Sequence, residues 1–174
     1  TNPDGEAFTN ELLFFWRRDD FKAFSKVRPY ITLPQDLADL QTYELGSPWL
    51  YFKVYTGIKV ADDILRQLHE LLQEPALAQY CQKFFFIRYE DPDFHLRLRF
   101  LGQGDFQNAL IQQVRALLQP YMANNTVWKL QAESYMPEYG RYGELTMAHS
   151  ESLFYHDSTA VMAILSLIDG DEGE

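Results

Sequence analysis

A strand pattern on either side of a short turn constrains the fold of this chain more than any other feature. The stretch from Phe84 to Phe100 reads FFFIRYEDPDFHLRLRF. Aromatic and β-branched residues dominate both halves, which is typical of β-strands. The central EDPD consists of residues that favour turns. The pattern therefore predicts two antiparallel strands joined as a hairpin.

The flanking sequence supplies the remaining elements of a known arrangement. Two strand patterns and two segments with apolar residues at helical spacing surround the hairpin, in residues 49–57, 59–77, 105–122 and 126–137. The resulting order, β-α-β-β-α-β over about residues 49–137, is that of the ferredoxin-like fold. We predict an α+β fold with an antiparallel sheet, two helices on one face, and a C-terminal helix in residues 145–168.

Composition places one boundary near the start of this patterned region. The chain has 174 residues, a length typical of one domain with one core. Residues 25–47 show no clear period, and the strand and helix patterns begin after Ser47 and Pro48. We therefore expect residues 1–46 to be an N-terminal lead-in and residues 47–174 to be the functional domain.

The overall charge excludes some classes of partner. The chain has 15 Lys and Arg against 25 Asp and Glu, for a net charge of −10. Such an acidic chain is a poor partner for a nucleic-acid backbone or an anionic membrane surface. We expect no direct contact with nucleic acid, and any positively charged site must be local.

Cofactor and targeting signals are not found in the sequence. Cys81 is the one cysteine, so neither a disulfide framework nor a cysteine-based zinc site can form. The four histidines lack metal-binding spacing, and no glycine-rich phosphate loop occurs. We expect neither metal nor cofactor. No stretch matches a signal peptide or approaches the roughly 18 apolar residues of a membrane span, so we expect a cytoplasmic protein.

Positive charge gathers on one face of the hairpin. Strand alternation places His95, Arg97 and Arg99 on one face and the intervening apolar residues on the face toward the helices. A pairing that keeps Ile87 beside Leu96 would add Arg88 to the cationic face. Whether Arg88 lies opposite His95 or Arg97 depends on the strand register, which the sequence leaves open.

Two interpretations account for this cluster. Like charges on one face of a sheet destabilise it, so the cluster needs either carboxylates of the protein itself or an anionic ligand. The chain has abundant acidic residues for the first interpretation. Arginine is the residue suited to bidentate recognition of carboxylate or phosphate, which supports the second.

A glycine-containing loop offers a second candidate group. In PEYGRYGE, Glu138 and Arg141 are three residues apart after the last predicted strand. Loops at strand ends often hold functional groups. The pair could tie down the turn locally. If the loop folds over the cationic face, Arg141 would extend an anion site, and Glu138 would orient an arginine or act as a base.

Four segments together resemble a known family. SPWLYFKVYTG, FFFIRYEDPDFHLRLRF, MPEYGRYGE and ESLFYHDS occur in this order. They resemble the C-terminal domain of the class I lantibiotic (lanthipeptide) dehydratases, which is also found in thiopeptide-type biosynthesis proteins. The resemblance covers about residues 47–168, and the hairpin is its most specific part.

The resemblance implies an activity. Enzymes of that family use glutamyl-tRNA to esterify Ser and Thr of a precursor peptide, and the C-terminal domain then eliminates glutamate to leave dehydroalanine or dehydrobutyrine. A lyase-type elimination site is thus implied, with Arg97, Arg99, Glu138 and Arg141 as catalytic residues and Arg88 and His95 supporting substrate binding. The implied partners are the glutamylated precursor peptide and the glutamylation domain, with a homodimer left open.

Two departures from the family pattern qualify this expectation. The loop reads RYGE where many relatives read RYGG, and no histidine of this chain occupies the place of the family's C-terminal histidine. We therefore expect a truncated elimination domain that acts within a longer enzyme. The alternatives are a binding module without catalysis and a thiopeptide cyclisation enzyme, and the retained arginines argue against the latter.

Overall fold

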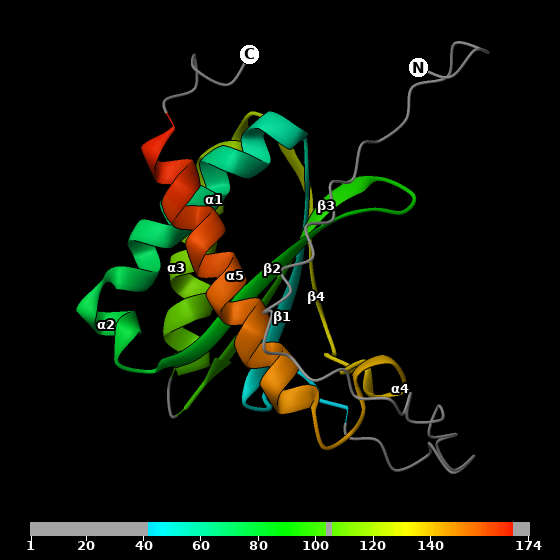
Figure 1. Cartoon of the computed structure of the whole chain (residues 1–174). Helices are drawn as coiled ribbons and strands as arrows, with labels where there is room; N and C mark the ends of the chain where they lie inside the picture. The colour runs from blue at the N-terminus through cyan, green and yellow to red at the C-terminus, as the bar shows by residue number, and fades with distance from the viewer. Residues whose placement is uncertain (1–41, 104–105, 169–174) are drawn as a thin grey trace, which may run out of the picture. The chain divides into compact units, whose positions relative to one another are not determined.

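The structure, a computed structural model, describes residues 42–103 and 106–168 (Figure 1). The expected lead-in of residues 1–46 lies outside this part of the chain, except for its last five residues. The helices and strands, in chain order, are β1 (Trp49–Thr56), α1 (Ile58–Gln73), α2 (Pro75–Ala78), β2 (Cys81–Glu90), β3 (Phe94–Gly102), α3 (Phe106–Ala123), β4 (Val127–Glu133), α4 (Tyr139–Tyr142) and α5 (Met147–Leu167).

The four strands form one antiparallel sheet in the order β2-β3-β1-β4. This order, with α1 and α3 in the two crossovers, is the predicted ferredoxin-like arrangement, and the α+β prediction is confirmed. The hairpin of β2 and β3 is also confirmed. Helix α1 stops before Pro75, whose ring cannot continue a helix, and Pro75 instead begins the short α2.

The main core lies between the sheet and its helices. Alternate residues of the two central strands, among them Phe52, Leu98 and Phe100, pack here against apolar residues of α1 and α3. All three are at most 5% exposed. Burial of this apolar surface is the main contribution to the stability of the fold. It also fixes the opposite face of β3 as the one that carries His95, Arg97 and Arg99.

A second, smaller aromatic cluster lies on that opposite face. It contains Trp49, Tyr51, Phe85 and Tyr135, with Phe154 of α5 packed against it. Helix α5 also contributes to the main core, through Met162. The helix therefore runs along the edge strand β2 and reaches both faces of the sheet, as its course beside β2 in Figure 1 indicates.

The register of the hairpin corrects one prediction. Arg88 pairs with Leu96, and Ile87 pairs with Arg97. Because paired residues share a face, Arg88 lies on the helical face and not on the cationic one. There its guanidinium forms an ion pair with Asp62 of α1. The expectation that Ile87 lies beside Leu96 was wrong because both faces of β2 carry large apolar residues, so alternation did not identify the buried one.

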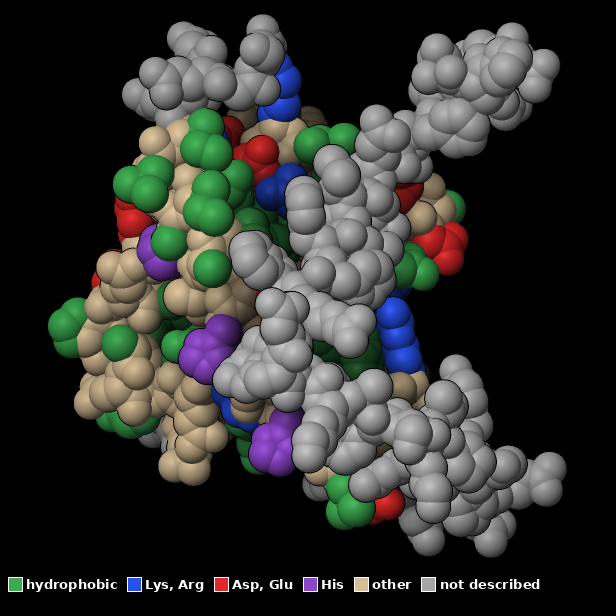
Figure 2. All heavy atoms as spheres, viewed as in Figure 1, with side chains coloured by type: hydrophobic (Ala, Val, Ile, Leu, Met, Phe, Trp, Pro, Cys, Tyr) green, Lys and Arg blue, Asp and Glu red, His purple; other side chains and the backbone are tan. Residues whose placement is uncertain are grey.

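The outer surface of α5 is unusually apolar. Leu153, Ile164 and Leu167 are 53–84% exposed. Figure 2 shows hydrophobic side chains at the surface over the C-terminal half of this helix. Within the described ranges, no helix combines the length and the apolar character that crossing a membrane would require.

Candidate functional site

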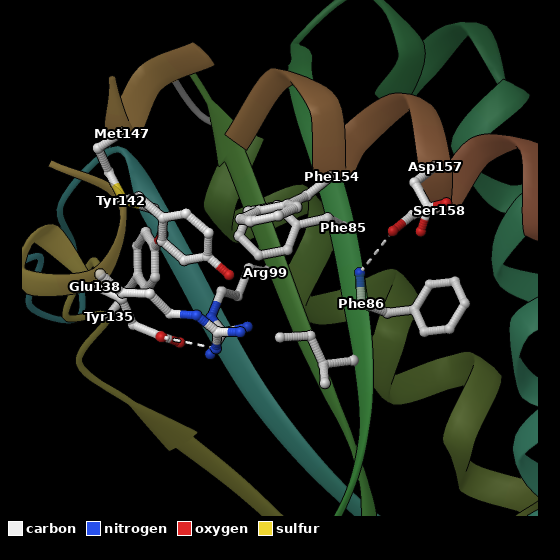
Figure 3. A pocket seen from close by; sticks show the side chains of 12 residues that line it. Phe85, Phe86, Arg99, Tyr135, Glu138, Tyr142, Met147, Phe154, Asp157 and Ser158 are labelled. Atoms are coloured by element: carbon white, nitrogen blue, oxygen red, sulfur yellow. Dashed lines mark hydrogen bonds and ion pairs between the residues drawn. The ribbon is translucent and has the colours of Figure 1, made fainter. Parts of the chain in front are cut away.

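A pocket of about 170 Å³ opens where β2, β3, α4 and α5 meet. Figure 3 shows Arg99 and Glu138 on one side of it and Asp157 and Ser158 of α5 on the other, with Phe85 and Phe86 between them. The remaining lining residues are Ile87, Tyr135, Arg141, Tyr142, Met147 and Phe154. The pocket is thus apolar along its walls and charged at its ends.

Arg99 is the most unusual group of this pocket. Its side chain is buried, with the residue only 7% exposed. Its Cζ lies 4.6 Å, 5.2 Å and 5.3 Å from the ring centroids of Tyr51, Tyr135 and Phe85. Ring faces attract a cation, so these contacts offset part of the cost of burial. Burial still lowers the pKa of the Arg99 guanidinium, although arginine keeps its proton in proteins.

The hydrogen-bonding capacity of Arg99 is not used up. Its buried Nε has no hydrogen-bond partner. Within the part of the chain that the structure describes, Arg99 forms no ion pair with a carboxylate. A buried donor without a partner costs roughly 1–3 kcal/mol. An unpaired cation beside a pocket is the arrangement expected of an anion site.

Arg97 lies next to Arg99 along the same face and is held by neutral groups. Its Cζ lies 3.5 Å from the ring centroid of Tyr89. Its Nε donates a hydrogen bond of 3.2 Å to Nε2 of His95. Since arginine can only donate, Nε2 accepts, and the His95 proton is on Nδ1, 2.8 Å from the carbonyl oxygen of Asp93. His95 is therefore a neutral imidazole in this arrangement.

Because His95 is neutral, the cationic face of the hairpin carries two positive charges, those of Arg97 and Arg99, and not three. His95 is 1% exposed and stacks on Tyr55, with 4.7 Å between the ring centroids. It acts as an acceptor for Arg97 and not as a third cation. Neither Arg97 nor Arg99 pairs with a carboxylate of the described chain. Within the described residues, neither arginine is neutralised by an ion pair with a carboxylate, although Glu138 lies near enough to Arg99 to raise its pKa electrostatically.

The loop before α5 brings Arg141 and Glu138 to the mouth of the pocket. The loop forms the single turn α4, and Glu138 Oε2 lies 3.5 Å from Arg141 Nη1. Both side chains are largely exposed, so the pair contributes little to stability. The loop folds toward the cationic face, as one alternative of the sequence analysis required, and Arg141 and Arg99 line the same pocket.

A buried hydrogen bond supports the aromatic wall. The Tyr135 hydroxyl donates to Oε1 of Glu151 at 2.8 Å, and both residues are at most 7% exposed. Burial raises the pKa of Glu151, and the hydrogen bond from Tyr135 opposes this shift. Burial also raises the pKa of Tyr135. The bond connects α5 to the ring that lies against Arg99.

Helix α5 is attached to the edge strand by Ser158. The Phe86 amide donates a hydrogen bond of 3.1 Å to the Ser158 hydroxyl, which is buried. This bond satisfies an edge-strand amide and explains why a buried serine follows Asp157. It also places the exposed carboxylate of Asp157 at the α5 side of the pocket (Figure 3).

Three of the predicted site residues line the pocket, namely Arg99, Glu138 and Arg141. Arg97 and His95 lie beside it on the same face, whereas Arg88 lies on the other face. The sequence analysis assigned no role to Tyr135, Glu151 or Asp157. Glu151 and Asp157 lie in ESLFYHDS, a segment used there only for its resemblance, and Tyr135 lies at the end of the predicted strand of residues 126–137. Among the described residues, no group of three or more metal-ligand side chains comes together.

Comparison with known proteins identifies the family. The model of the C-terminal part of lantibiotic biosynthesis dehydratases matches residues 49–174. This chain belongs to that family. The resemblance seen in the sequence is thereby confirmed.

The similar proteins are much longer than this chain. The subtilin biosynthesis protein SpaB of Bacillus subtilis is 29% identical over 120 residues, which are 68% of this chain. The nisin biosynthesis protein NisB of Lactococcus lactis subsp. lactis is 30% identical over 127 residues, or 69% of this chain. This dehydratase C-terminal domain matches 12% of the length of each.

A solved structure agrees with the fold. The tRNA-dependent lantibiotic dehydratase MibB from Microbispora sp. 107891 is similar to this chain with a TM-score of 0.61 and 32% sequence identity. The similarity covers 72% of this chain and 12% of MibB. The dehydratase C-terminal domain described here therefore corresponds to a small part of each of these proteins.

Proposed function

We propose that this chain eliminates glutamate from glutamylated Ser or Thr of a precursor peptide, as a domain of a lanthipeptide dehydratase. The observation that carries the proposal is Arg99, a buried cation whose Nε lacks a partner at the side of a pocket that Arg141 also lines. Membership of the dehydratase family supports the proposal independently.

The reaction needs a base and a site for the departing carboxylate, and the arginines of the pocket suit the second of these. A base removes the α-proton of the esterified residue, and the electrons of that C–H bond form the Cα–Cβ double bond. The Cβ–O bond breaks at the same time, and glutamate leaves as a carboxylate. Cations that are already in place where this charge develops lower the barrier without rearranging. Arg99 and Arg141 are the cations of the pocket, and Arg97 lies beside them.

Glu138 has two roles open to it. Its ion pair with Arg141 at 3.5 Å supports the role of orienting that arginine toward the pocket. Its position at the pocket mouth also allows it to accept the α-proton directly. We favour the orienting role, because the Glu138 carboxylate already faces Arg141.

The test is mass spectrometry of a synthetic peptide that carries a glutamyl-serine ester. We expect the wild-type chain to release glutamate and leave dehydroalanine, and the Arg99→Met variant to be at least about a hundredfold slower, as for the loss of one oxyanion-stabilising group. Arg115→Met, which removes an exposed arginine of α3 outside the pocket, is the matched control and should retain the wild-type rate.

Two results would contradict the proposal. Elimination that is unchanged in Arg99→Met would show that the pocket is not the site. Binding of the peptide that depends on Arg99, without any elimination, would reduce the function to that of a binding module.

A further inference from the structure

The pocket carries opposite charges at its two sides. Arg99 of β3 and Arg141 of α4 both line the pocket. Figure 3 shows Asp157 of α5 on the side opposite Arg99. The other two carboxylates near the pocket already have partners: Glu138 pairs with Arg141, and Glu151 accepts from Tyr135. Asp157 has no ion-pair or hydrogen-bond partner among the residues that the structure describes.

The two charged sides are separated by one strand. Arg99 of β3 pairs with Phe85 of β2, and the next residue, Phe86, donates its amide hydrogen to Ser158 beside Asp157. Neighbouring strands lie about 4.8 Å apart. A ligand that contacts both sides therefore has to extend across β2, with its anionic and cationic groups at opposite ends. The apolar walls formed by Phe85, Ile87 and Phe154 suit the carbon chain between those groups.

We propose that Asp157 binds the α-ammonium group of the glutamyl moiety and so selects a glutamyl ester over one without an amino group. This inference rests on the proposed function. Amino acids are carried on tRNA as esters of their α-carboxyl group. Transfer of a glutamyl group from tRNA to a hydroxyl leaves a free ammonium and a free side-chain carboxylate. Asp157 binds the ammonium, and Arg99 and Arg141 bind the carboxylates.

The charge of the pocket makes this inference specific. Glutarate has the same two carboxylates as glutamate and lacks the ammonium, so it carries one more net negative charge. A pocket that only attracted anions would bind glutarate at least as tightly as glutamate. Preference for glutamate requires a group that attracts the ammonium, and Asp157 is the unpaired carboxylate in the pocket lining.

Calorimetric titration of the chain with glutamate and with glutarate tests the inference. We expect the wild-type chain to bind glutamate on the order of fivefold more tightly, which is the upper range for an exposed ion pair. Asp157→Asn should lose this preference without weakening glutarate binding. Glu70→Gln removes one negative charge from the exposed surface of α1, outside the pocket, and should keep the preference.

The possible failures point to different errors. Equal binding of the two ligands by the wild-type chain, or an unchanged preference in Asp157→Asn, would overturn the role of Asp157 and leave the elimination site intact. If neither ligand binds, or if binding is unchanged in Arg99→Met, both this inference and the proposed function are wrong.

Discussion

At the scale of single residues, the candidate site is defined by a buried cation that has no carboxylate ion pair among the described residues. Arg99 is buried among three rings, and its Nε makes no hydrogen bond. A buried cation without a paired anion costs stability, and this supports the proposed anion site. By contrast, His95 and Tyr135 have satisfied polar groups and hold their neighbours in place.

Replacement of Arg99 by methionine should therefore leave the chain as stable or more stable. Methionine fills a similar volume without a charge, and such replacements of buried charges are often neutral or stabilising by about 1–2 kcal/mol. Chemical denaturation measures the change, with Arg115→Met as a control that should stay close to the wild type. A loss of 3 kcal/mol or more would mean that Arg99 is a structural residue.

The pair of Glu151 and Tyr135 predicts a dependence of stability on pH. Burial raises the pKa of Glu151 in the folded chain. The folded state then holds this proton more tightly than the unfolded state, so stability falls as pH rises from the ordinary glutamate pKa of about 4.3 through the raised value.

Glu151→Gln removes this titration. The free energy of unfolding of the wild type minus that of Glu151→Gln should decrease as the pH rises through that range and then level off. Denaturation series at several pH values give this difference directly. A difference that grows with pH would show that the hydrogen bond from Tyr135 outweighs the effect of burial.

At the scale of elements, the position of α5 along β2 completes the pocket. The helix provides Phe154 to the aromatic cluster and Asp157 to the pocket, and Ser158 attaches it to the edge strand. The same helix packs into the main core through Met162. The site therefore depends on an element that lies outside the β-α-β-β-α-β core.

Ser158→Ala tests this attachment. It leaves the partly buried Phe86 amide without its partner, and we expect a loss of about 1 kcal/mol or more in the free energy of unfolding. Ser152→Ala is a suitable control, because the Ser152 hydroxyl donates to the Ala148 carbonyl of its own helix. That change should be close to neutral. Equal effects of the two substitutions would contradict the role given to Ser158.

The sequence predicted the elements better than their contacts. Helical spacing in α1 and α3 reflects burial on one face, and in β3 apolar residues alternate with His95, Arg97 and Arg99, which is why the fold could be predicted. In β2 both faces are covered, by the main core and by the aromatic cluster, so the same rule misplaced Arg88. The place of Asp157 depends on how α5 packs, and spacing along the chain does not encode this.

At the scale of the whole molecule, one face of the sheet carries the main core and the other carries the candidate site. The helical face carries the main core and the ion pair of Arg88 with Asp62, while the other face carries the arginines of the candidate site. A chain with net charge −10 repels anions at long range, so the proposed recognition of glutamate has to come from local, partly desolvated cations. The pocket beside Arg99 meets this requirement.

The central claim is that Arg99 binds a carboxylate of glutamate, and an NMR titration tests this claim most directly. In a chain labelled with ¹⁵N at the arginine Nε, the Arg99 signal is assigned by its absence in Arg99→Met. We predict that this signal shifts and saturates as glutamate is added, while the Arg88 signal, from the opposite face, stays in place. An Arg99 signal that does not move at glutamate concentrations that saturate binding would contradict the account.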